Sequence, residues 1–239
     1  MTHGHDIRAG GEIVESFERF GILAFTTGRA AGSFGTASDE PVREVMSRWS
    51  ALRTLVGGAT ARLATATQVH GTQIIEHAGA WRGWLRGEDA DGHLAFERGT
   101  AMAVTVADCV PVFLAHPSGA TAMLHSGWRG TAGGVTARAI ERFVALGLAA
   151  KEIRLHCGPA ICGRCYEVSP DVFRQLTGRS VDSPTPVDLR GLIAAQARTL
   201  GIHEISLSAL CTRCDGDRFY SHRGADSGRQ LGVVLAHRA

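Results

Sequence analysis

Three residues that can bind a metal ion stand where apolar runs of the sequence end. Cys109 follows one run of strand-forming residues, His125 follows a second, and His70 ends a third. One thiolate and two imidazoles can hold zinc through three protein ligands, which leaves a fourth position open for water or substrate. That arrangement is typical of catalytic rather than structural zinc, so the pattern predicts a zinc-dependent active site.

The same residues also allow a metal-free interpretation. A single buried cysteine is usually an inert apolar side chain, and a single histidine usually has a structural role. Cys109 and His125 are also the residue types that form the nucleophile and the base of a Cys-His-Asp hydrolase. A cysteine hydrolase therefore stays open beside the zinc enzyme.

Two charged residues next to these candidate ligands have alternative roles. Asp108 either caps the end of its strand or takes part in the chemistry, as an acid/base or by orienting a ligand histidine. Arg129 either holds its turn through a salt bridge or binds an anion, because a guanidinium offers a two-pronged donor to phosphate oxygens. The glycines that follow Arg129 could add backbone N–H donors, but the lysine of a Walker phosphate-binding loop is missing.

Four further cysteines form two Cys-x-x-Cys pairs, Cys162/Cys165 and Cys211/Cys214. The pairs are further apart in the sequence than those of common zinc ribbons. We therefore favour thiols packed beneath loops at these positions, with a structural metal or a redox role for either pair alone as alternatives. The sequence does not determine whether the two pairs meet or bind a metal.

The elements that must position these residues are of both types and alternate irregularly. The sequence predicts strands on both sides of Asp108-Cys109 and over residues 22–26, 63–70, 121–125, 153–157, 205–207 and 231–235. Helices are expected after Pro41, Gly134, Ser169 and Asp188. The pattern predicts a single α+β domain with a mostly antiparallel or mixed sheet core. We expect residues 1–11 to be a flexible N-terminus and residues 12–239 to form one catalytic domain.

Composition excludes several other classes of protein. The formal net charge is only +2 and the basic residues are scattered, which disfavours nucleic-acid and membrane partners. Lys151 is the only lysine, so Schiff-base chemistry has almost no candidate. No apolar stretch is long enough for a membrane span, and no signal peptide is seen, so we expect a cytoplasmic enzyme with reduced thiols. His3 and His5 form the only His-x-His pair, whereas a multicopper oxidase needs several.

With these residues assembled, the chain resembles the YfiH-like family, also called laccase-domain or polyphenol oxidoreductase-like proteins. The matching motifs follow the order of the family and extend over most of the chain. They are Gln68-Val-His70-Gly71, Asp89-Ala-Asp91-Gly92, Ala107-Asp108-Cys109-Val110-Pro111-Val112, His125-Ser-Gly-Trp128-Arg129-Gly130-Thr131, Cys157-Gly-Pro159-Ala160-Ile161 with Cys165-Tyr166-Glu167-Val168, Cys211-Thr212, and Phe219-Tyr220-Ser221-His222-Arg223.

The resemblance implies a four-layer α/β/β/α sandwich with mixed sheets and one zinc ion held by His70, Cys109 and His125. It also implies phosphorolysis of adenosine and inosine to the free base and ribose 1-phosphate, with methylthioadenosine cleavage and adenosine deamination as accompanying activities. The older laccase label makes copper an alternative metal and polyphenol oxidation an alternative activity. A role in peptidoglycan editing, attached to bacterial members, gives the cysteine hydrolase or amidase its substrate.

Site roles follow from this resemblance and from residue type. Arg48 matches an arginine that the family places near the substrate, and we expect it to position phosphate, with Arg129 or Arg223 next in order. Asp108 is the candidate acid that assists departure of the purine. The expected catalytic residues are thus Cys109, Asp108 and Arg48. The expected substrate-binding residues are Arg48, Gln68, Arg129, Phe219 and Arg223.

The chain departs from the family pattern in the glycine-rich loop at residues 27–36. The family carries an asparagine-containing segment here, and this chain has a shorter loop without it. Ser221-His222-Arg223 also stands where a Ser-Tyr-Arg run is usual. The preferred nucleoside and the oligomeric state are not fixed by the sequence.

Overall fold

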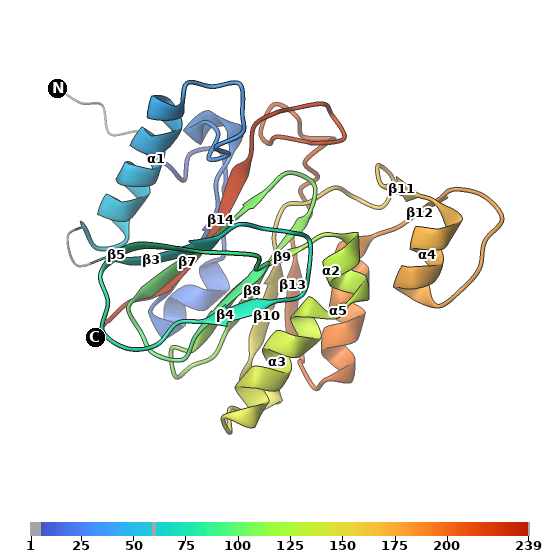
Figure 1. Ribbon diagram of the computed structural model, residues 1–239. Coiled ribbons are helices and arrows are strands. Elements are labelled where there is room, and N and C mark those ends of the chain that lie inside the picture. The colour runs from blue at the N-terminus through green and yellow to red at the C-terminus, as the bar shows by residue number, and fades with distance from the viewer. Residues whose placement is uncertain (1–5, 59–60, 239) are drawn as a thin grey trace.

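Two six-stranded sheets form the centre of the protein in the computed structural model, which describes residues 6–58 and 61–238 (Figure 1). The first sheet has the strand order β1-β2-β14-β7-β3-β5, and the second has the order β13-β10-β8-β9-β6-β4. Both sheets mix parallel with antiparallel pairs, as the sequence predicted.

The strands of each sheet come from widely separated parts of the chain. The first sheet is built from β1 (Glu12–Ile13), β2 (Ile22–Thr26), β3 (Arg62–Ala66), β5 (Gly83–Gly87), β7 (Thr100–Val106) and β14 (Gln230–Ala236). The second is built from β4 (Ile74–Glu76), β6 (Gly92–Ala95), β8 (Val110–Ala115), β9 (Thr121–Ser126), β10 (Arg154–Cys157) and β13 (Glu204–Leu207). Because β7 and β8 belong to different sheets, residues 107–109 cross from one sheet to the other.

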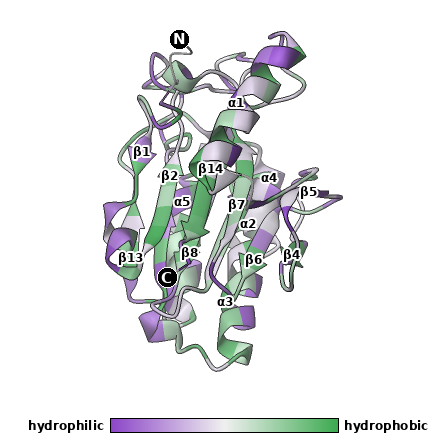
Figure 2. Ribbon diagram, turned by 90° about the vertical axis from the view of Figure 1, so that its left-hand side faces the viewer, coloured by the Kyte–Doolittle hydropathy of each residue, from purple (hydrophilic) through white to green (hydrophobic). Residues whose placement is uncertain are grey.

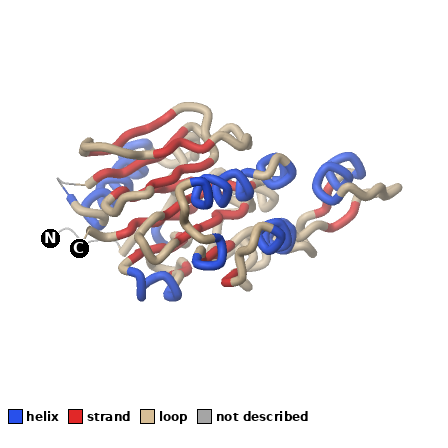
Figure 3. The backbone as a smooth tube through the Cα atoms, turned by 90° about the horizontal axis from the view of Figure 1, so that it is seen from below, coloured by secondary structure: helices blue, strands red, loops and turns tan. Residues whose placement is uncertain are grey.

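Helices cover the outer face of each sheet, which gives four layers in the order α/β/β/α. The helix α1 (Val42–Leu55) packs on the first sheet through Val45, Trp49 and Leu52. The helices α3 (Val135–Ala145) and α5 (Leu189–Thr199) pack on the second sheet. The helix α4 (Pro170–Thr177) and the small sheet of β11 (Glu167–Val168) and β12 (Thr185–Pro186) project to one side (Figures 1 and 3). The predicted fold class is confirmed.

Side-chain alternation along the strands explains why the layers assemble. In β7, Ala101 and Ala103 face α1, while Met102 and Val104 join the core between the two sheets. Phe113 and Met123 fill the same inter-sheet core from the second sheet. Apolar residues on both faces of these strands make the centre of the molecule uniformly hydrophobic (Figure 2).

The predicted strand over residues 63–70 is wrong at its C-terminal end, because β3 stops at Ala66. Beyond Ala66, the side-chain amide of Gln68 makes the hydrogen bonds to β7 that a strand backbone would make. Its Oε1 accepts the Thr105 N–H at 2.8 Å, and its Nε2 donates to the Thr105 carbonyl at 2.8 Å. With its side chain bonded to β7, the chain leaves the sheet. His70 therefore lies in a loop and not on a strand face.

Residues 1–11 were expected to be flexible, and the structure describes this segment only from residue 6 onward. His3 and His5 lie outside the described residues. Ile7 is buried in the core beside α1. The Arg218 guanidinium donates to the carbonyls of Gly10 and Gly11 at 3.1 and 3.0 Å. Within the described ranges, no helix combines the length and the apolar character that crossing a bilayer requires.

Candidate active site

A cavity of about 570 Å³ opens where the loops after β3, β7 and β9 meet two later loops of the chain. Its volume falls in the range of small-molecule sites. The wall includes all three candidate metal ligands together with Asp108, Gln68, Arg129 and Arg223. Most of the residues singled out from the sequence are thus brought to one place.

The three candidate ligands converge although each comes from a different element. His125 lies near the end of β9, Cys109 in the crossing between β7 and β8, and His70 in the loop after β3. The Cys109 Sγ and one ring nitrogen of each histidine lie within 4.8 Å of one another. The two imidazole rings meet edge to face at 79°, with centroids 4.8 Å apart. These are separations that a single ion can bridge.

One buried carboxylate, Asp91, holds this arrangement together. Its Oδ1 lies 2.7 Å from His125 Nδ1 and accepts the His70 N–H at 2.9 Å. Its Oδ2 accepts the N–H groups of Val69 and Gly71 at 3.2 and 2.6 Å. With Nδ1 bound to Asp91, His125 presents Nε2 to Cys109 and to any metal, which is the carboxylate–histidine–metal arrangement of zinc sites.

Asp91 also stabilises an unusual backbone at His70. His70 has a φ of 60°, in the left-handed region that non-glycine residues rarely occupy. Three consecutive N–H donors converge on the one carboxylate and fix this turn. Sequence reasoning recognised Asp91 only as part of a family motif and assigned it no role. Of the roles left open for Asp108, the orientation of a ligand histidine is performed in the structure by Asp91.

Gly127 makes the close packing of the ligands possible. A Cβ at this position would lie 2.8 Å from the Cys109 sulfur and 3.3 Å from Cδ2 of His70. Carbon and sulfur do not approach so closely without strain, so any other side chain would displace a ligand. Gly127, two residues after His125 in the sequence, is thus part of the site geometry.

Electrostatics favour a charged pair of Cys109 and His125. Burial opposes charge on both groups, but the two neighbouring histidines outweigh it and lower the pKa of the Cys109 thiol to about 6. Burial likewise works against the imidazolium, yet the Cys109 thiolate and Asp91 raise the pKa of His125 to about 9. For Asp91, hydrogen bonds from His125 and the backbone overcome burial and lower its pKa. Cys109 is therefore poised as a thiolate, the form that binds metals and attacks electrophiles.

The donor set fits one zinc ion with an open position. In a tetrahedral zinc site the ligand atoms are about 3.5 Å apart, which the 4.8 Å limit accommodates. Among residues 6–58 and 61–238, the other cluster of three or more metal-binding side chains contains only cysteines. A trinuclear copper centre, which needs several further histidines, therefore does not fit the described part of the chain.

The arginines of the site differ from the expected set. Arg48 is absent from the cavity wall, because its guanidinium pairs with Glu40 and donates to the Ser33 carbonyl at 2.8 Å. Arg86 and Arg129 both line the cavity, and neither has a hydrogen-bond acceptor or an acidic partner within the described ranges. Arg129 instead lies 4.2 Å above the centre of the Trp128 ring. Free guanidinium groups on a cavity wall can bind an anion.

Asp108 lines the cavity but its carboxylate is occupied. Oδ1 accepts the Thr212 hydroxyl at 2.6 Å, and Oδ2 accepts the backbone N–H of Arg223 at 2.7 Å. Asp108 itself has a φ of 80°, so its backbone is also in the left-handed region. These contacts tie the loop at residues 211–223 to the crossing between the sheets, and they place the Arg223 backbone at the cavity.

Two expected substrate-binding residues have other contacts. The Gln68 side chain lines the cavity, yet its amide is bonded to Thr105 as described above. Phe219 is fully buried and is not among the cavity-lining residues. Its neighbours His222 and Arg223 reach the cavity instead.

Aromatic side chains form a wall that sequence reasoning did not assign to the site. Trp84 stacks on Trp49 with ring centroids 4.7 Å apart and an angle of 25°, and both line the cavity. Tyr166 lines it from the loop after β10, with the Arg223 guanidinium 5.1 Å from its ring centre. Phe34, from the divergent glycine-rich loop, also contributes. Trp49 belongs to the buried face of α1, and no local signal in the sequence indicated that it also reaches a ligand cavity.

Comparison with known proteins gives a consistent set of relatives. The family described as multi-copper polyphenol oxidoreductase laccase matches residues 26–237. The chain is 36% identical over 208 residues to purine nucleoside phosphorylase ORF3 of Streptomyces griseus, covering 84% of each protein. It is 33% identical over 230 residues to a purine nucleoside phosphorylase of Deinococcus radiodurans, covering 88% of this chain and 87% of that protein.

Solved structures share the four-layer fold. YlmD of Geobacillus stearothermophilus is similar with a TM-score of 0.84 at 26% identity, covering 91% of this chain and 93% of that one. Hypothetical protein YfiH of Bacillus licheniformis is similar with a TM-score of 0.86 at 21% identity, covering 94% and 96%. The resemblance read from the sequence motifs is confirmed.

Proposed function

Because the chain belongs to the multi-copper polyphenol oxidoreductase laccase family, we propose that it acts as its curated relatives are named, as a purine nucleoside phosphorylase. Phosphate would replace the base at C1′ of adenosine, inosine or methylthioadenosine. The products would be the free purine and ribose 1-phosphate, or 5-methylthioribose 1-phosphate from methylthioadenosine. One observation carries the proposal: a single cavity combines aromatic walls with guanidinium groups that have no acidic partner in the described ranges. A purine nucleoside and phosphate need both kinds of surface.

The side chains of this cavity suit the two substrates in different ways. The guanidinium groups of Arg86 and Arg129 would bind phosphate, and Arg223 would join them from the loop anchored by Asp108. The faces of Trp84 and Tyr166 would hold the flat purine base. In this proposal Asp108 is a positioning residue, since both of its oxygens already accept hydrogen bonds.

We further propose that His70, Cys109 and His125 hold zinc. When bound, the ion would supply a Lewis acid that polarises an oxygen of substrate or water. Asp91 fixes the His125 ring so that Nε2 faces the ion, and the neighbouring histidines keep Cys109 as the thiolate that a metal requires. A weaker adenosine deaminase activity would depend on this ion.

Product analysis tests the proposal directly. Purified protein is incubated with inosine or adenosine, with and without phosphate, and the products are separated by chromatography. Phosphate-dependent release of hypoxanthine or adenine together with ribose 1-phosphate is expected. The Cys109→Ala variant should lose both retained zinc and turnover. Full phosphorolysis by a metal-free Cys109→Ala protein would refute the role of the metal site.

A second candidate function uses the same residues without metal. Cys109, His125 and Asp91 stand in the order of a nucleophile, a base and an orienting carboxylate, and the pKa of Cys109 is lowered to about 6. This geometry favours a cysteine hydrolase or amidase, for which a cell-wall peptide is the candidate substrate.

Metal analysis and alkylation separate the two functions. A zinc-bound thiolate should resist iodoacetamide in protein purified without added metal, and should react after chelation. A free nucleophile should react at once, before any chelator is added. Copper-dependent phenol oxidation is less favoured than either, because the described residues offer no site for a copper cluster.

A further inference from the structure

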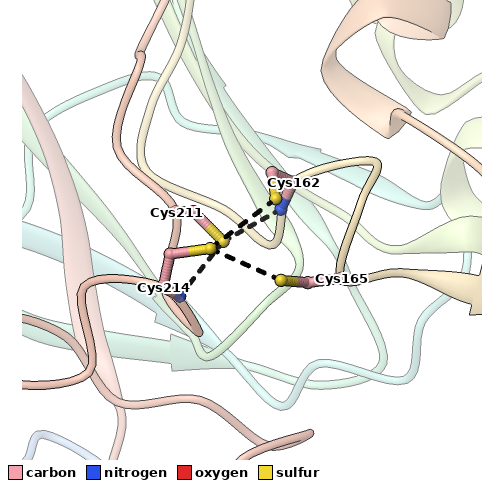
Figure 4. A group of neighbouring side chains, drawn as sticks. All are labelled: Cys162, Cys165, Cys211 and Cys214. Carbon is pink, nitrogen blue, oxygen red and sulfur yellow. Dashed lines mark hydrogen bonds between the residues drawn. The ribbon is translucent and has the colours of Figure 1, made fainter.

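A second group of side chains suited to a metal lies outside the cavity. The Sγ atoms of the two Cys-x-x-Cys pairs all lie within 4.8 Å of one another (Figure 4). Cys214 Sγ is 3.4 Å from Cys165 Sγ and 4.0 Å from Cys162 Sγ. The sequence left open whether the two pairs meet, and the structure brings them into one cluster.

The sheet topology explains why pairs so distant in sequence meet. The strands β10 and β13 are parallel neighbours in register, with Cys157 opposite Leu207. The loops that follow parallel neighbours leave the sheet at the same edge. An isolated bridge between Ala160 and Cys211 then continues the pairing beyond the strands. One Cys-x-x-Cys pair lies in each of these loops.

The sulfur separations match a mononuclear tetrathiolate site. Zinc–sulfur bonds of about 2.3 Å in a tetrahedron place the sulfur atoms about 3.8 Å apart. The observed 3.4 and 4.0 Å lie on either side of that value, whereas a disulfide requires about 2.0 Å. All four cysteines are free thiols. An iron–sulfur cluster would hold its four thiolates further apart than a single ion does.

Backbone N–H groups point at one sulfur of the cluster, that of Cys211. Cys211 Sγ accepts the backbone N–H groups of Cys162 at 3.2 Å and of Cys214 at 3.4 Å. Backbone donors aimed at a sulfur stabilise its thiolate form. Each pair also carries an arginine between its cysteines, Arg164 and Arg213. Four thiolates around one divalent ion have a net charge of −2, and a positively charged residue thus lies next to one cysteine of each pair in the sequence.

We propose that Cys162, Cys165, Cys211 and Cys214 bind one structural zinc ion, separate from the site of His70, Cys109 and His125. Four protein thiolates leave no position for substrate, so this ion has a structural role. The proposal is independent of the proposed function and stands or fails without it.

The ion would fix two loops that form part of the cavity wall. The first pair lies between Ile161 and Tyr166, which both line the cavity. The second pair flanks Thr212, whose hydroxyl donates to Asp108, and it precedes Arg223 on the same loop. A zinc ion that joins these loops would therefore hold the cavity wall in place from behind.

Metal content of matched variants tests the proposal. The protein is purified in reducing buffer without added metal, and zinc per chain is measured by mass spectrometry of the elements. Cys165→Ser/Cys214→Ser should lose about one equivalent of zinc relative to wild type. Cys157→Ala, which removes the one cysteine outside both groups, should lose none. Cys109→Ala should keep the equivalent that the double variant loses.

A spectroscopic test keeps the proposal falsifiable if the double variant folds poorly. Cys214 is exposed, so Cys214→Ser alone leaves the core untouched. Cobalt-loaded Cys109→Ala protein should show the visible bands of a tetrahedral ion and strong thiolate-to-metal charge transfer. Cys214→Ser added to it removes one of the four thiolates, so it should weaken that charge transfer and shift the visible bands. Unchanged zinc in the double variant, iron in place of zinc, or a disulfide within the cluster would each overturn the proposal.

Discussion

Replacing Asp91 with asparagine is expected to damage both stability and metal binding, although the two side chains have nearly the same shape. The carboxylate accepts three backbone N–H groups and the Nδ1 hydrogen of His125. Asparagine has one acceptor oxygen and one donor NH₂ group. In either orientation of the amide, two buried donors face another donor and lose their acceptor.

The size of the effect follows from those two lost acceptors. A buried donor left without a partner costs about 1–3 kcal/mol, and the three backbone donors here are partly buried, so Asp91→Asn should lower the free energy of unfolding by about 2–4 kcal/mol. If the NH₂ group faces His125, the ring must carry its hydrogen on Nε2 and cannot bind a metal. If the NH₂ group faces Val69 and Gly71, the turn that places His70 is lost. Zinc affinity should therefore fall by about 10–100-fold in either case.

Denaturant unfolding and competition with a chromophoric zinc chelator measure the two effects. Asp89→Asn is the matched control, because Asp89 lies two residues away, is exposed, and tolerates asparagine at its φ of 51°. The pKa of Asp91 is lowered in the folded protein, so its contribution to stability is complete above its unfolded pKa and is lost as the pH falls through the folded value. The loss of stability on the acid limb of the wild-type curve should be smaller in Asp91→Asn, while Asp226, whose pKa is also lowered, keeps its own contribution. A variant with wild-type stability and zinc affinity would refute this account.

Three further predictions address the cavity. Arg129→Ala should raise the KM for phosphate by about 10-fold or more while the KM for inosine changes little, because one charge-assisted hydrogen bond is worth about 1.5–3 kcal/mol. Arg179→Ala is the control, because Arg179 is exposed and lies outside the cavity. Equal effects of Arg129→Ala on both KM values would contradict the assignment. Gly127→Ala should lose zinc, because its Cβ would lie 2.8 Å from the Cys109 sulfur. Gly216→Ala is the control and should retain zinc, because its Cβ would meet only a carbonyl oxygen at 3.7 Å. Elemental analysis measures the zinc content of both proteins. In metal-free protein, alkylation of Cys109 should rise through about pH 6, because the neighbouring histidines lower its pKa; a midpoint near 9 would show that the thiolate is not stabilised.

Sequence reasoning identified the three candidate ligands because their residue types follow apolar runs. For Cys109 and His125 the reason was sound, since both stand at the ends of buried strands. For His70 the prediction of a strand end was wrong, because β3 stops at Ala66. What places His70 is the carboxylate of Asp91, which becomes its neighbour only through the parallel pairing of β4 with β6. Contacts of this kind depend on the assembled sheet and leave no periodic signal in the chain.

The sequence alone also could not show which arginines are free to bind an anion. Arg48 was predicted to bind phosphate from its place on a helix and from family resemblance, yet a partner that precedes the helix, Glu40, neutralises it. Arg86 drew no attention in the sequence, and it reaches the cavity because β5 pairs in parallel with β3, so that the ends of both strands meet. An arginine binds an anion only where the fold leaves its charge without an internal partner. The sequence therefore identifies arginines that could bind an anion. Which of them are free to do so depends on the acidic residues packed beside each guanidinium.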